Sequence, residues 1–232
     1  MLDTVIILAG GLGTRLKSVL PDTPKCLAPI NNKPFIGQLL NFLKNQGINK
    51  FIFSLGFKNE LVIRYLDEEF DDMNICYSVE KEQLGTGGAI KLALANVISE
   101  DVLVINGDTF FNNDLALFYK FHQANASKFT MALTMVESND RFGSVIIDEQ
   151  NKIIGFSEKT QNSSVLINAG QYIINRKYFL NFNLKDKFSI ELDYFQNNDF
   201  EKTIYGYEYL SDFIDIGIPD DLIRAQTFFN KN

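Results

Sequence analysis

Residues 5–30 read VIILAGGLGTRLKSVLPDTPKCLAPI. A short apolar run rich in β-branched residues leads into three glycines within residues 10–13, which is typical of a buried strand that ends in a tight turn. Two fixed positive charges, Arg15 and Lys25, follow the glycines. Bare backbone N–H groups beside such cations can approach phosphate oxygens closely, so the stretch predicts a polyphosphate site.

The glycine-rich turn matches neither of two common phosphate-binding loops. A Walker A loop ends in Gly-Lys-Ser/Thr, whereas Gly13-Thr14-Arg15 stands here. The dinucleotide-binding fingerprint needs a third glycine that this loop lacks, which disfavours an oxidoreductase of that class. A plain strand-to-helix turn needs glycine only for a positive φ, and three glycines with two cations exceed that need.

Strand-like and helix-like segments alternate over the first 120 residues or so. Strands are expected within residues 4–10, 50–56, 74–80 and 101–108, and helices within residues 33–48, 58–70, 85–98 and 114–125. This alternation predicts an α/β fold with a mostly parallel central sheet and helices on both faces. Ligands of such sheets bind at the carboxyl ends of the strands, so the glycine loop, Glu80 and Asp108 should share one edge.

The pattern then changes to strand-like segments with few helices between them. Strands are expected within residues 129–136, 144–159, 163–175 and 202–209, and late helices within residues 189–197 and 219–231, the second started by Pro219. No Pro- or Ser-rich linker marks a boundary. We therefore expect one domain, residues 1–232, with a nucleotide-binding half (1–120) and a second half of mixed sheet (121–232).

The composition argues against nucleic acid and membranes as partners. The 232 residues are 46% hydrophobic, enough for one sizeable core, and the formal net charge of -7 argues against nucleic acid as the main partner. No apolar run approaches the ~20 residues that span a bilayer, so no membrane partner is expected. Two cysteines without metal-ligand spacing favour a reduced, cytoplasmic setting. The single histidine, His122, looks like part of an ordinary helix face.

Several motifs, in order along some 215 residues, carry a resemblance. They are LAGGLGTRL (8–16), PKCLAPI (24–30), LGTGGAI (84–90), NGD (106–108), RFGSV (141–145), EKT (158–160), NAGQYII (168–174) and DIGIPDD (215–221). Together they resemble the sugar-1-phosphate nucleotidylyltransferases, although Thr160 stands where many members have proline. The resemblance implies a Rossmann-like sheet with an appended sugar-binding region. It also implies attack by a sugar 1-phosphate oxygen on the α-phosphorus of a nucleoside triphosphate, with pyrophosphate leaving.

The same resemblance assigns roles to residues of this chain. Arg15, Lys25 and Lys159 are expected to be catalytic through charge and positioning, the first two on the β- and γ-phosphates and the third on the sugar phosphate. The expected nucleotide-binding residues are Leu8, Ala9, Gly10, Gly11, Gly13, Thr14, Glu80, Gly85 and Thr86. The expected sugar-binding residues are Asn106, Gly107, Gly143, Glu158 and Asn168. Asp108 and Asp215 are expected to hold Mg²⁺, which prefers few carboxylates and keeps phosphate oxygens and waters.

Each of these roles has a plainer alternative. Lys25 could be a solvated surface lysine, and Asp108 a cap of a helix or turn. Asp215 could cap the last helix, although Asp220 or Asp221 could serve there instead. Asn168 could be a turn residue.

The base and the sugar are separate questions. The resemblance implies that the residue five before Gly85, which is Glu80, reads the edge of the base. A carboxylate only accepts hydrogen bonds, and guanine offers two adjacent donors, N1–H and N2–H, so GTP is favoured over UTP. The alternative is that Glu80 faces solvent and that Glu82 or backbone groups read the base. The segments around Glu80 and Asp108 are most similar to bacterial D-glycero-α-D-manno-heptose 1-phosphate guanylyltransferases, and the choice of heptose rests on this resemblance alone.

Two competing functions remain open at this point. One is a mannose- or glucose-1-phosphate nucleotidylyltransferase that uses GTP or UTP. The other is a non-catalytic nucleotide-sugar sensor, which would have no need of both Asp108 and Asp215. A homo-oligomer is compatible with the sequence, which contains no signal for its order.

Overall fold

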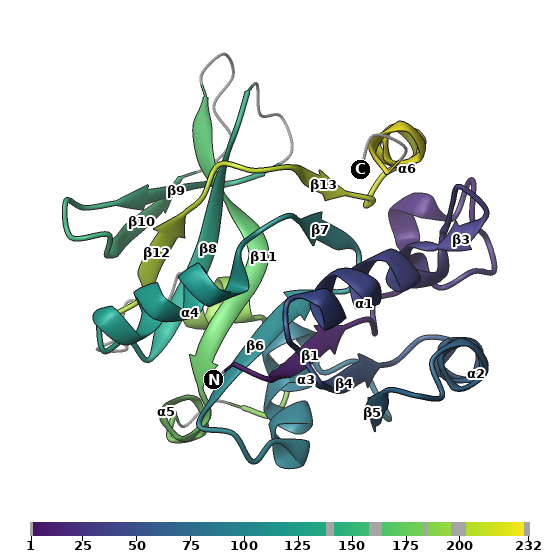
Figure 1. The fold of residues 1–232 in the computed structure, drawn as a ribbon, viewed down its shortest axis with the longest axis horizontal. Coiled ribbons are helices and arrows are strands. Elements are labelled where there is room, and N and C mark those ends of the chain that lie inside the picture. Colours follow the sequence, from purple (N-terminus) through teal and green to yellow (C-terminus); the bar gives the residue numbers. More distant parts are fainter. Residues whose placement is uncertain (1, 138–141, 158–163, 183–184, 196–202, 230–232) are drawn as a thin grey trace.

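A nine-stranded mixed sheet forms the centre of the molecule (Figure 1). The computed structural model describes residues 2–137, 142–157, 164–182, 185–195 and 203–229. The main path of the sheet is β10-β9-β11-β6-β1-β4-β5, and β8 joins β11 to β12 beside it. The nine strands are β1 (Thr4–Leu8), β4 (Lys50–Leu55), β5 (Asn74–Val79), β6 (Asp101–Asn106), β8 (Phe129–Val136), β9 (Ser144–Ile147), β10 (Ile153–Ser157), β11 (Val165–Asn175) and β12 (Tyr205–Glu208).

The strands of the first half are parallel, as the alternating pattern predicts. β1 pairs with β4 and β6, and β4 pairs with β5, all in parallel register. β11 then pairs antiparallel with β6 and continues the sheet into the second half, where β8 and β9 also run antiparallel to it. The appended mixed region is therefore an extension of the same sheet.

Helices cover both faces of the parallel strands. Successive β1 residues point to opposite faces, so Val5 and Ile7 join one hydrophobic cluster while Ile6 joins another. The first cluster includes residues of α1 (Phe35–Asn45), α2 (Asn59–Glu69), α4 (Leu115–Ala124) and α6 (Pro219–Phe228). The second includes residues of α3 (Gly85–Ala93), α5 (Arg176–Leu180) and a π-helix, Ile190–Phe195. This arrangement confirms the predicted fold class.

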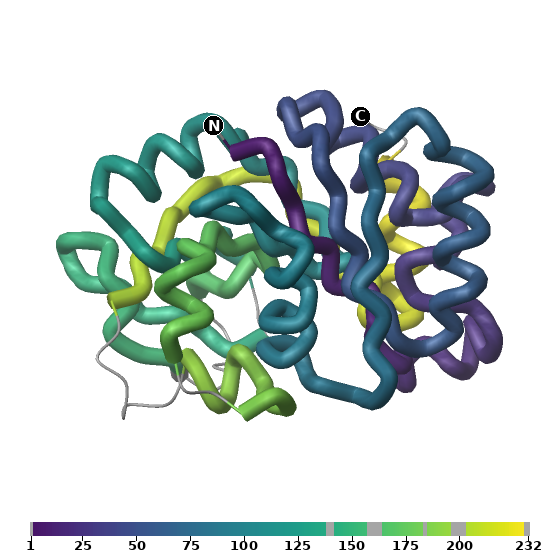
Figure 2. The backbone as a smooth tube through the Cα atoms, turned by 90° about the horizontal axis from the view of Figure 1, so that it is seen from below, coloured from purple at the N-terminus to yellow at the C-terminus, as the bar shows by residue number. Residues whose placement is uncertain are grey.

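The C-terminal helix packs against the N-terminal part of the chain. Figure 2 shows the yellow helix α6 beside the purple N-terminal segment. The Asn31 backbone N–H donates to Gln226 Oε1 at 2.8 Å, and the Phe35 and Phe229 rings pack edge to face. Two small two-stranded sheets lie outside the main sheet: β2 (Pro29–Ile30) with β3 (Lys33–Pro34), and β7 (Thr109–Phe111) with β13 (Phe213–Asp215).

Two predicted helices differ from those observed. The segment predicted as a helix over 189–197 is a π-helix, in which Ile190, Tyr194 and Phe195 are all buried. Spacings of four and five residues suit its wider turn better than an α-helix. The helix predicted within 85–98 ends at Ala93 and continues as a 3₁₀ turn, Leu94–Asn96. No helix in the described ranges is long and apolar enough to cross a bilayer.

Candidate active site

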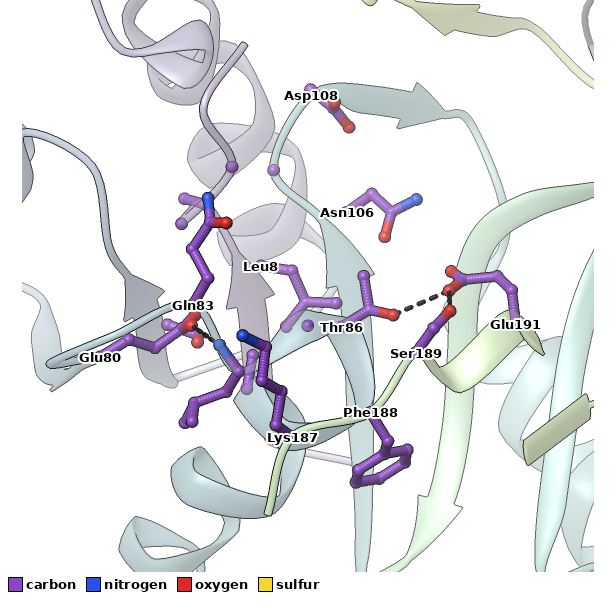
Figure 3. A pocket seen from close by; sticks show the side chains of 18 of the residues that line it. Leu8, Glu80, Gln83, Thr86, Asn106, Asp108, Lys187, Phe188, Ser189 and Glu191 are labelled. Carbon is purple, nitrogen blue, oxygen red and sulfur yellow. Dashed lines mark hydrogen bonds between the residues drawn. The ribbon is translucent and has the colours of Figure 1, made fainter. Parts of the chain in front are cut away.

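A cavity of about 650 Å³ lies at the carboxyl ends of β1, β5 and β6 (Figure 3). Its size suits a nucleotide-sized ligand. Eleven of the residues proposed from the sequence line it: Leu8, Ala9, Gly10, Gly11, Lys25, Glu80, Gly85, Thr86, Asn106, Gly107 and Asp108. The glycine loop, Glu80 and Asp108 therefore do share one edge of the sheet.

Other proposed residues lie elsewhere. Gly13 ends the glycine loop as the N-cap of the 3₁₀ turn Thr14–Leu16. Thr14 and Arg15 are exposed, and none of these three residues lines the cavity. Glu158 and Lys159 lie outside the described residues. The roles given to these five residues stay predictions.

The glycine loop is held against neighbouring backbone. A Cβ on Gly10 would lie 2.9 Å from Glu80 Oε1 and 3.2 Å from the Gly56 backbone nitrogen. A Cβ on Gly107 would lie 2.8 Å from the Leu8 carbonyl oxygen, which accepts the Gly107 N–H at 2.9 Å. Gly10 and Gly107 thus let the ends of β1, β5 and β6 approach one another closely.

Two acids from distant parts of the sequence meet beside the glycine loop. β13 pairs antiparallel with β7, which places Asp215 opposite Thr109. The Thr109 hydroxyl lies 3.2 Å from Asp108 Oδ1 and 3.2 Å from Asp215 Oδ2. The Gly217 N–H donates to Asp215 Oδ1 at 2.7 Å. The carboxylates of Asp108 and Asp215 are therefore held around one shared hydroxyl.

Lys25 is paired with one of these acids. Its ammonium donates to Asp108 Oδ2, and the two side chains are 17% and 28% exposed. Lys25 is therefore not a solvated surface lysine. The plain alternative for Asp215 also fails, because Ile218 occupies the N-cap position of α6 and no side chain caps that helix.

The pair of acids fits a divalent metal. Carboxylate oxygens are the ligands that Mg²⁺ prefers, and it binds through one or two of them while substrate phosphates and waters fill the remaining positions. Within the described residues no cluster of three or more His, Cys, Asp or Glu side chains could hold a metal. If Asp108 and Asp215 hold Mg²⁺, phosphate oxygens and waters would complete its coordination.

Glu80 reaches the cavity from the end of β5. Its Oε2 accepts the Leu84 N–H at 2.9 Å. Burial raises the pKa of the Glu80 carboxyl, and the hydrogen bond from Leu84 offsets part of the rise. Gln83 lines the cavity beside it, whereas Glu82 is exposed and is not among the lining residues. A ligand in the cavity would therefore meet Glu80 and Gln83 on this side, not Glu82.

Asn168 lies in β11, not in a turn. Its Nδ2 donates to the Tyr172 hydroxyl at 2.7 Å, and its Oδ1 accepts the Gly170 N–H at 2.9 Å. The pairing of β11 with β8 shifts register between Asn168 and Tyr172, and Gly170 has a φ of 72° there. A Cβ on Gly170 would lie 2.8 Å from Asn106 Nδ2. This irregularity brings the strand that carries Asn168 against Asn106 of the cavity.

Gly143 lies near the strand that carries Asn168. It is exposed and directly precedes β9, whose Ser144 pairs with Ile167 of β11, the neighbour of Asn168. Neither Gly143 nor Asn168 is among the residues that line the cavity. Their sugar-binding roles stay predictions.

One wall of the cavity is not foreseen by the sequence pattern. It is lined by Lys187, Phe188, Ser189, Glu191 and Asp193. The first two precede the helix predicted over 189–197, and the other three lie within it. The alternation of polar residues in KFSIELD was the available signal, but nothing in it indicates contact with α3.

This segment packs on the glycine-rich start of α3. The Phe188 carbonyl accepts the N–H groups of Gly87 and Gly88 at 3.1 and 3.3 Å. A Cβ on Gly87 would lie 2.0 Å from the Phe188 ring, and one on Gly88 would lie 2.2 Å from the Asp186 carbonyl oxygen. Gly87 and Gly88 are therefore required by packing, and their N–H groups are already satisfied within the chain.

Comparison with known proteins gives this geometry a context. The model of a family described as nucleotidyl transferase matches residues 4–232. The chain belongs to the nucleotidyl transferase family.

Within the family, the chain is similar to two curated relatives named D-glycero-alpha-D-manno-heptose 1-phosphate guanylyltransferase. The protein from Aneurinibacillus thermoaerophilus is 42% identical over 95% of this chain and 96% of its own length. The one from Campylobacter jejuni is 44% identical over 93% and 95%. A crystal structure of HddC from Yersinia pseudotuberculosis complexed with GMP-PN superposes with a TM-score of 0.89, at 36% identity, over 99% of this chain and all of that one.

Membership accounts for the chemistry of the described site. Nucleotidyl transfer needs charge neutralisation around phosphates more than it needs a side-chain nucleophile. Lys25 and the two acids supply charged groups at the sheet edge, whereas His122 is buried on α4 with its Nδ1 2.7 Å from the Thr130 hydroxyl. His122 therefore takes no part in this site.

Proposed function

We propose that the chain is a guanylyltransferase that acts on D-glycero-α-D-manno-heptose 1-phosphate. It would transfer GMP from GTP to the sugar phosphate, giving GDP-heptose and pyrophosphate. The observation that carries the proposal is one cavity that joins a guanine-compatible carboxylate, Glu80, to the Lys25, Asp108 and Asp215 group. The names of the two similar curated relatives support the choice of heptose.

The reaction is an in-line displacement. An oxygen of the sugar 1-phosphate forms a new bond to the α-phosphorus of GTP, while the bond from that phosphorus to the oxygen bridging to the β-phosphate breaks. The attacking phosphate is already ionised at neutral pH, so no strong base is needed. The difficulty is that two anionic phosphates repel each other. The site would offset this repulsion by holding them in position and by supplying positive charge.

Lys25 and the two acids divide this work. Lys25, which Asp108 holds at the mouth of the glycine loop, would neutralise charge that develops on the leaving pyrophosphate. Asp108 and Asp215 would hold Mg²⁺. When bound, Mg²⁺ supplies positive charge that draws phosphate oxygens together. Arg15 and Lys159 are proposed to add charge on the triphosphate and on the sugar phosphate.

Guanine selection would depend on Glu80. Its carboxylate can accept from N1–H and N2–H of guanine together, whereas uracil would oppose it with carbonyl oxygens. The hydrogen bond from Leu84 holds Oε2 in place without using all of its lone pairs. The product would then enter the synthesis of a surface polysaccharide.

The direct test is pyrophosphate release across a matrix of nucleoside triphosphates and sugar 1-phosphates. GTP with D-glycero-α-D-manno-heptose 1-phosphate should give the highest kcat/KM, above GTP with mannose 1-phosphate and above UTP with any sugar. A preference for mannose or glucose 1-phosphate would reject the heptose assignment, and preference for UTP would reject guanine. No release with any pair, from folded protein with Mg²⁺, would indicate a nucleotide-sugar sensor.

A further inference from the structure

Glu191 has an unusual setting in the wall of the cavity. Its Oε2 accepts from the Thr86 hydroxyl at 2.7 Å and from the Ser189 hydroxyl at 2.9 Å. The Ile190 N–H in turn donates to Thr86 Oγ1 at 3.0 Å, which fixes that hydroxyl. The Glu191 carboxylate is thus locked by two donors on one of its oxygens.

The other oxygen of this carboxylate has no such partner. Within the described part of the chain Glu191 Oε1 accepts no hydrogen bond. Figure 3 shows the Glu191 carboxylate beside Thr86 and Ser189 on one side of the cavity, with Glu80 and Gln83 on the opposite side. A half-buried carboxylate with an open oxygen needs a donor from a ligand or from water.

The neighbours of Glu191 indicate which part of the substrates it would meet. Burial raises the pKa of the Tyr172 hydroxyl, and the negative charge of Glu191 adds to the rise, so the two groups lie close enough to interact. The Tyr172 hydroxyl also accepts from Asn168 Nδ2. Glu191 therefore stands between the start of α3 and the strand that carries Asn168, away from the Glu80 side of the cavity.

We propose that Glu191 is a specificity-determining residue that accepts a hydrogen bond from a substrate hydroxyl. This assignment rests on the proposed transferase function. A carboxylate would repel the phosphates, which excludes them as its partners. The guanine N–H donors are assigned to Glu80 on the opposite side of the cavity. The remaining donors are hydroxyls, which occur both on the sugar 1-phosphate and on the ribose of the nucleotide.

The preset geometry explains why such a residue would discriminate. Thr86 and Ser189 hold the carboxylate before any ligand binds, so little rotamer freedom is lost when the substrate hydroxyl arrives. A substrate without that hydroxyl leaves Oε1 unpaired, and sites built to bond a hydroxyl reject the deoxy analogue strongly. The analogue that lacks the recognised hydroxyl should therefore have a lower kcat/KM than the parent substrate.

The test pairs a variant with substrate analogues. Wild-type protein and Glu191→Gln are compared with 2′-deoxy- and 3′-deoxy-GTP in one arm, and with sugar 1-phosphates lacking one hydroxyl at a time in the other. We expect one analogue to lower the wild-type kcat/KM roughly 10- to 100-fold, the loss of one charge-assisted hydrogen bond. The same analogue should lower the kcat/KM of Glu191→Gln much less. If the analogue is a deoxy-GTP, the hydroxyl that Glu191 binds is on the ribose, and if it is a deoxy sugar 1-phosphate, the hydroxyl is on the sugar.

Controls separate recognition from structure. Glu68→Gln removes one charge from an exposed position on α2 and should keep every wild-type penalty. Ser189→Ala retains the carboxylate but loosens it, so it should give an intermediate penalty. If Glu191 had only a structural role, Glu191→Gln would lower kcat/KM for all substrates alike. If each deoxy analogue lowered kcat/KM by the same factor in Glu191→Gln as in wild type, the proposal would be overturned.

Failure of the proposed function would be visible separately. If the wild-type protein releases no pyrophosphate with any pair, calorimetric titration with the same GTP, sugar phosphates and deoxy analogues replaces kinetics. Weaker binding of one deoxy analogue to wild type, with that difference lost in Glu191→Gln, would still support the role of Glu191. Equal loss for all ligands would reject it.

Discussion

At the scale of single residues, the site depends on charges that only the fold brings together. Asp108 and Asp215 share the Thr109 hydroxyl, and Lys25 is paired with Asp108. The resemblance assigns metal binding to both acids, and Asp108 also stands at the end of a predicted strand. It could not show that one hydroxyl joins them, because that contact depends on the pairing of β7 with β13.

Loss of Asp108, one of the two proposed Mg²⁺ ligands, should slow the reaction strongly. We expect Asp108→Asn to lower turnover by at least ~100-fold, because less metal charge at a phosphoryl transfer costs several kcal/mol. The measurement is pyrophosphate release with saturating GTP and sugar 1-phosphate across a Mg²⁺ titration. Asp71→Asn, at an exposed turn, is the matched control and should be unaffected. Full wild-type activity in EDTA would remove the metal assignment.

Base selection should depend on the ionisation of Glu80. We expect Glu80→Gln to lower kcat/KM for GTP roughly 30-fold, which corresponds to about 2 kcal/mol. The amide NH₂ of glutamine would face one of the two N–H donors of guanine, where the carboxylate offers an acceptor. UTP should lose less, because an amide can donate to a carbonyl oxygen. Glu82→Gln, outside the cavity, is the control. An unchanged GTP to UTP ratio in Glu80→Gln would show that another group reads the base.

The same residue predicts a pH dependence. Burial raises the pKa of Glu80, and accepting from guanine needs the ionised form. Wild-type kcat/KM for GTP should therefore fall as the pH drops through this raised pKa, at a higher pH than an ordinary glutamate would give. Glu80→Gln has no carboxyl to protonate there, so this limb should vanish from its profile. A limb that persists in the variant belongs to a different group.

At the scale of elements, the four parallel strands and the helices of the first half follow from pattern. The segment expected as strand over 144–159 forms two strands, β9 and β10, and helix α5 was not expected. Period-two burial in β1 and helical spacing in α1 are local properties that a sequence displays. The contact of residues 186–191 with α3 joins segments about a hundred residues apart. The local sequence pattern of neither segment indicates that they touch. The π-helix is likewise set by the core that buries Tyr194 and Phe195.

The glycines at the start of α3 give a test of this contact. We expect Gly87→Ala to destabilise the protein by roughly 1–3 kcal/mol, because its Cβ would overlap the Phe188 ring. The measurement is the urea unfolding free energy. Gly155→Ala is the control, since the nearest atom to its Cβ lies at 3.8 Å. In a Phe188→Ala background, Gly87→Ala should cost nothing further, and an equal cost in both backgrounds would mean that the ring is not the obstacle.

At the scale of the whole molecule, one sheet runs through both proposed halves. β6 of the first half pairs with β1 on one side and with β11 of the second half on the other. β7 pairs with β13, and α6 packs on the N-terminal segment. The sequence pattern predicts a parallel half and a mixed half. The pairing of β6 with β11 and of β7 with β13, which connects the halves, is long-range and cannot be read from local periodicity.

This continuity predicts that the chain unfolds as a single cooperative unit. Separating the halves would expose unpaired edges of β6 and β11 and part of both hydrophobic clusters, so a state with only one half folded should be unstable. We therefore expect one transition in urea at equilibrium, with the same midpoint for every probe.

The aromatic composition supplies a probe that tells the halves apart. The chain has no tryptophan, and six of its nine tyrosines, at 172, 178, 194, 205, 207 and 209, lie in the second half. Tyrosine fluorescence thus reports mainly on residues 121–232, whereas far-UV circular dichroism reports on both halves. Coincident curves are expected because β11 cannot leave β6 without exposing the core of the parallel strands. A tyrosine transition at lower urea than the circular dichroism transition would show that the second half unfolds alone, and the single-domain assignment would then be wrong.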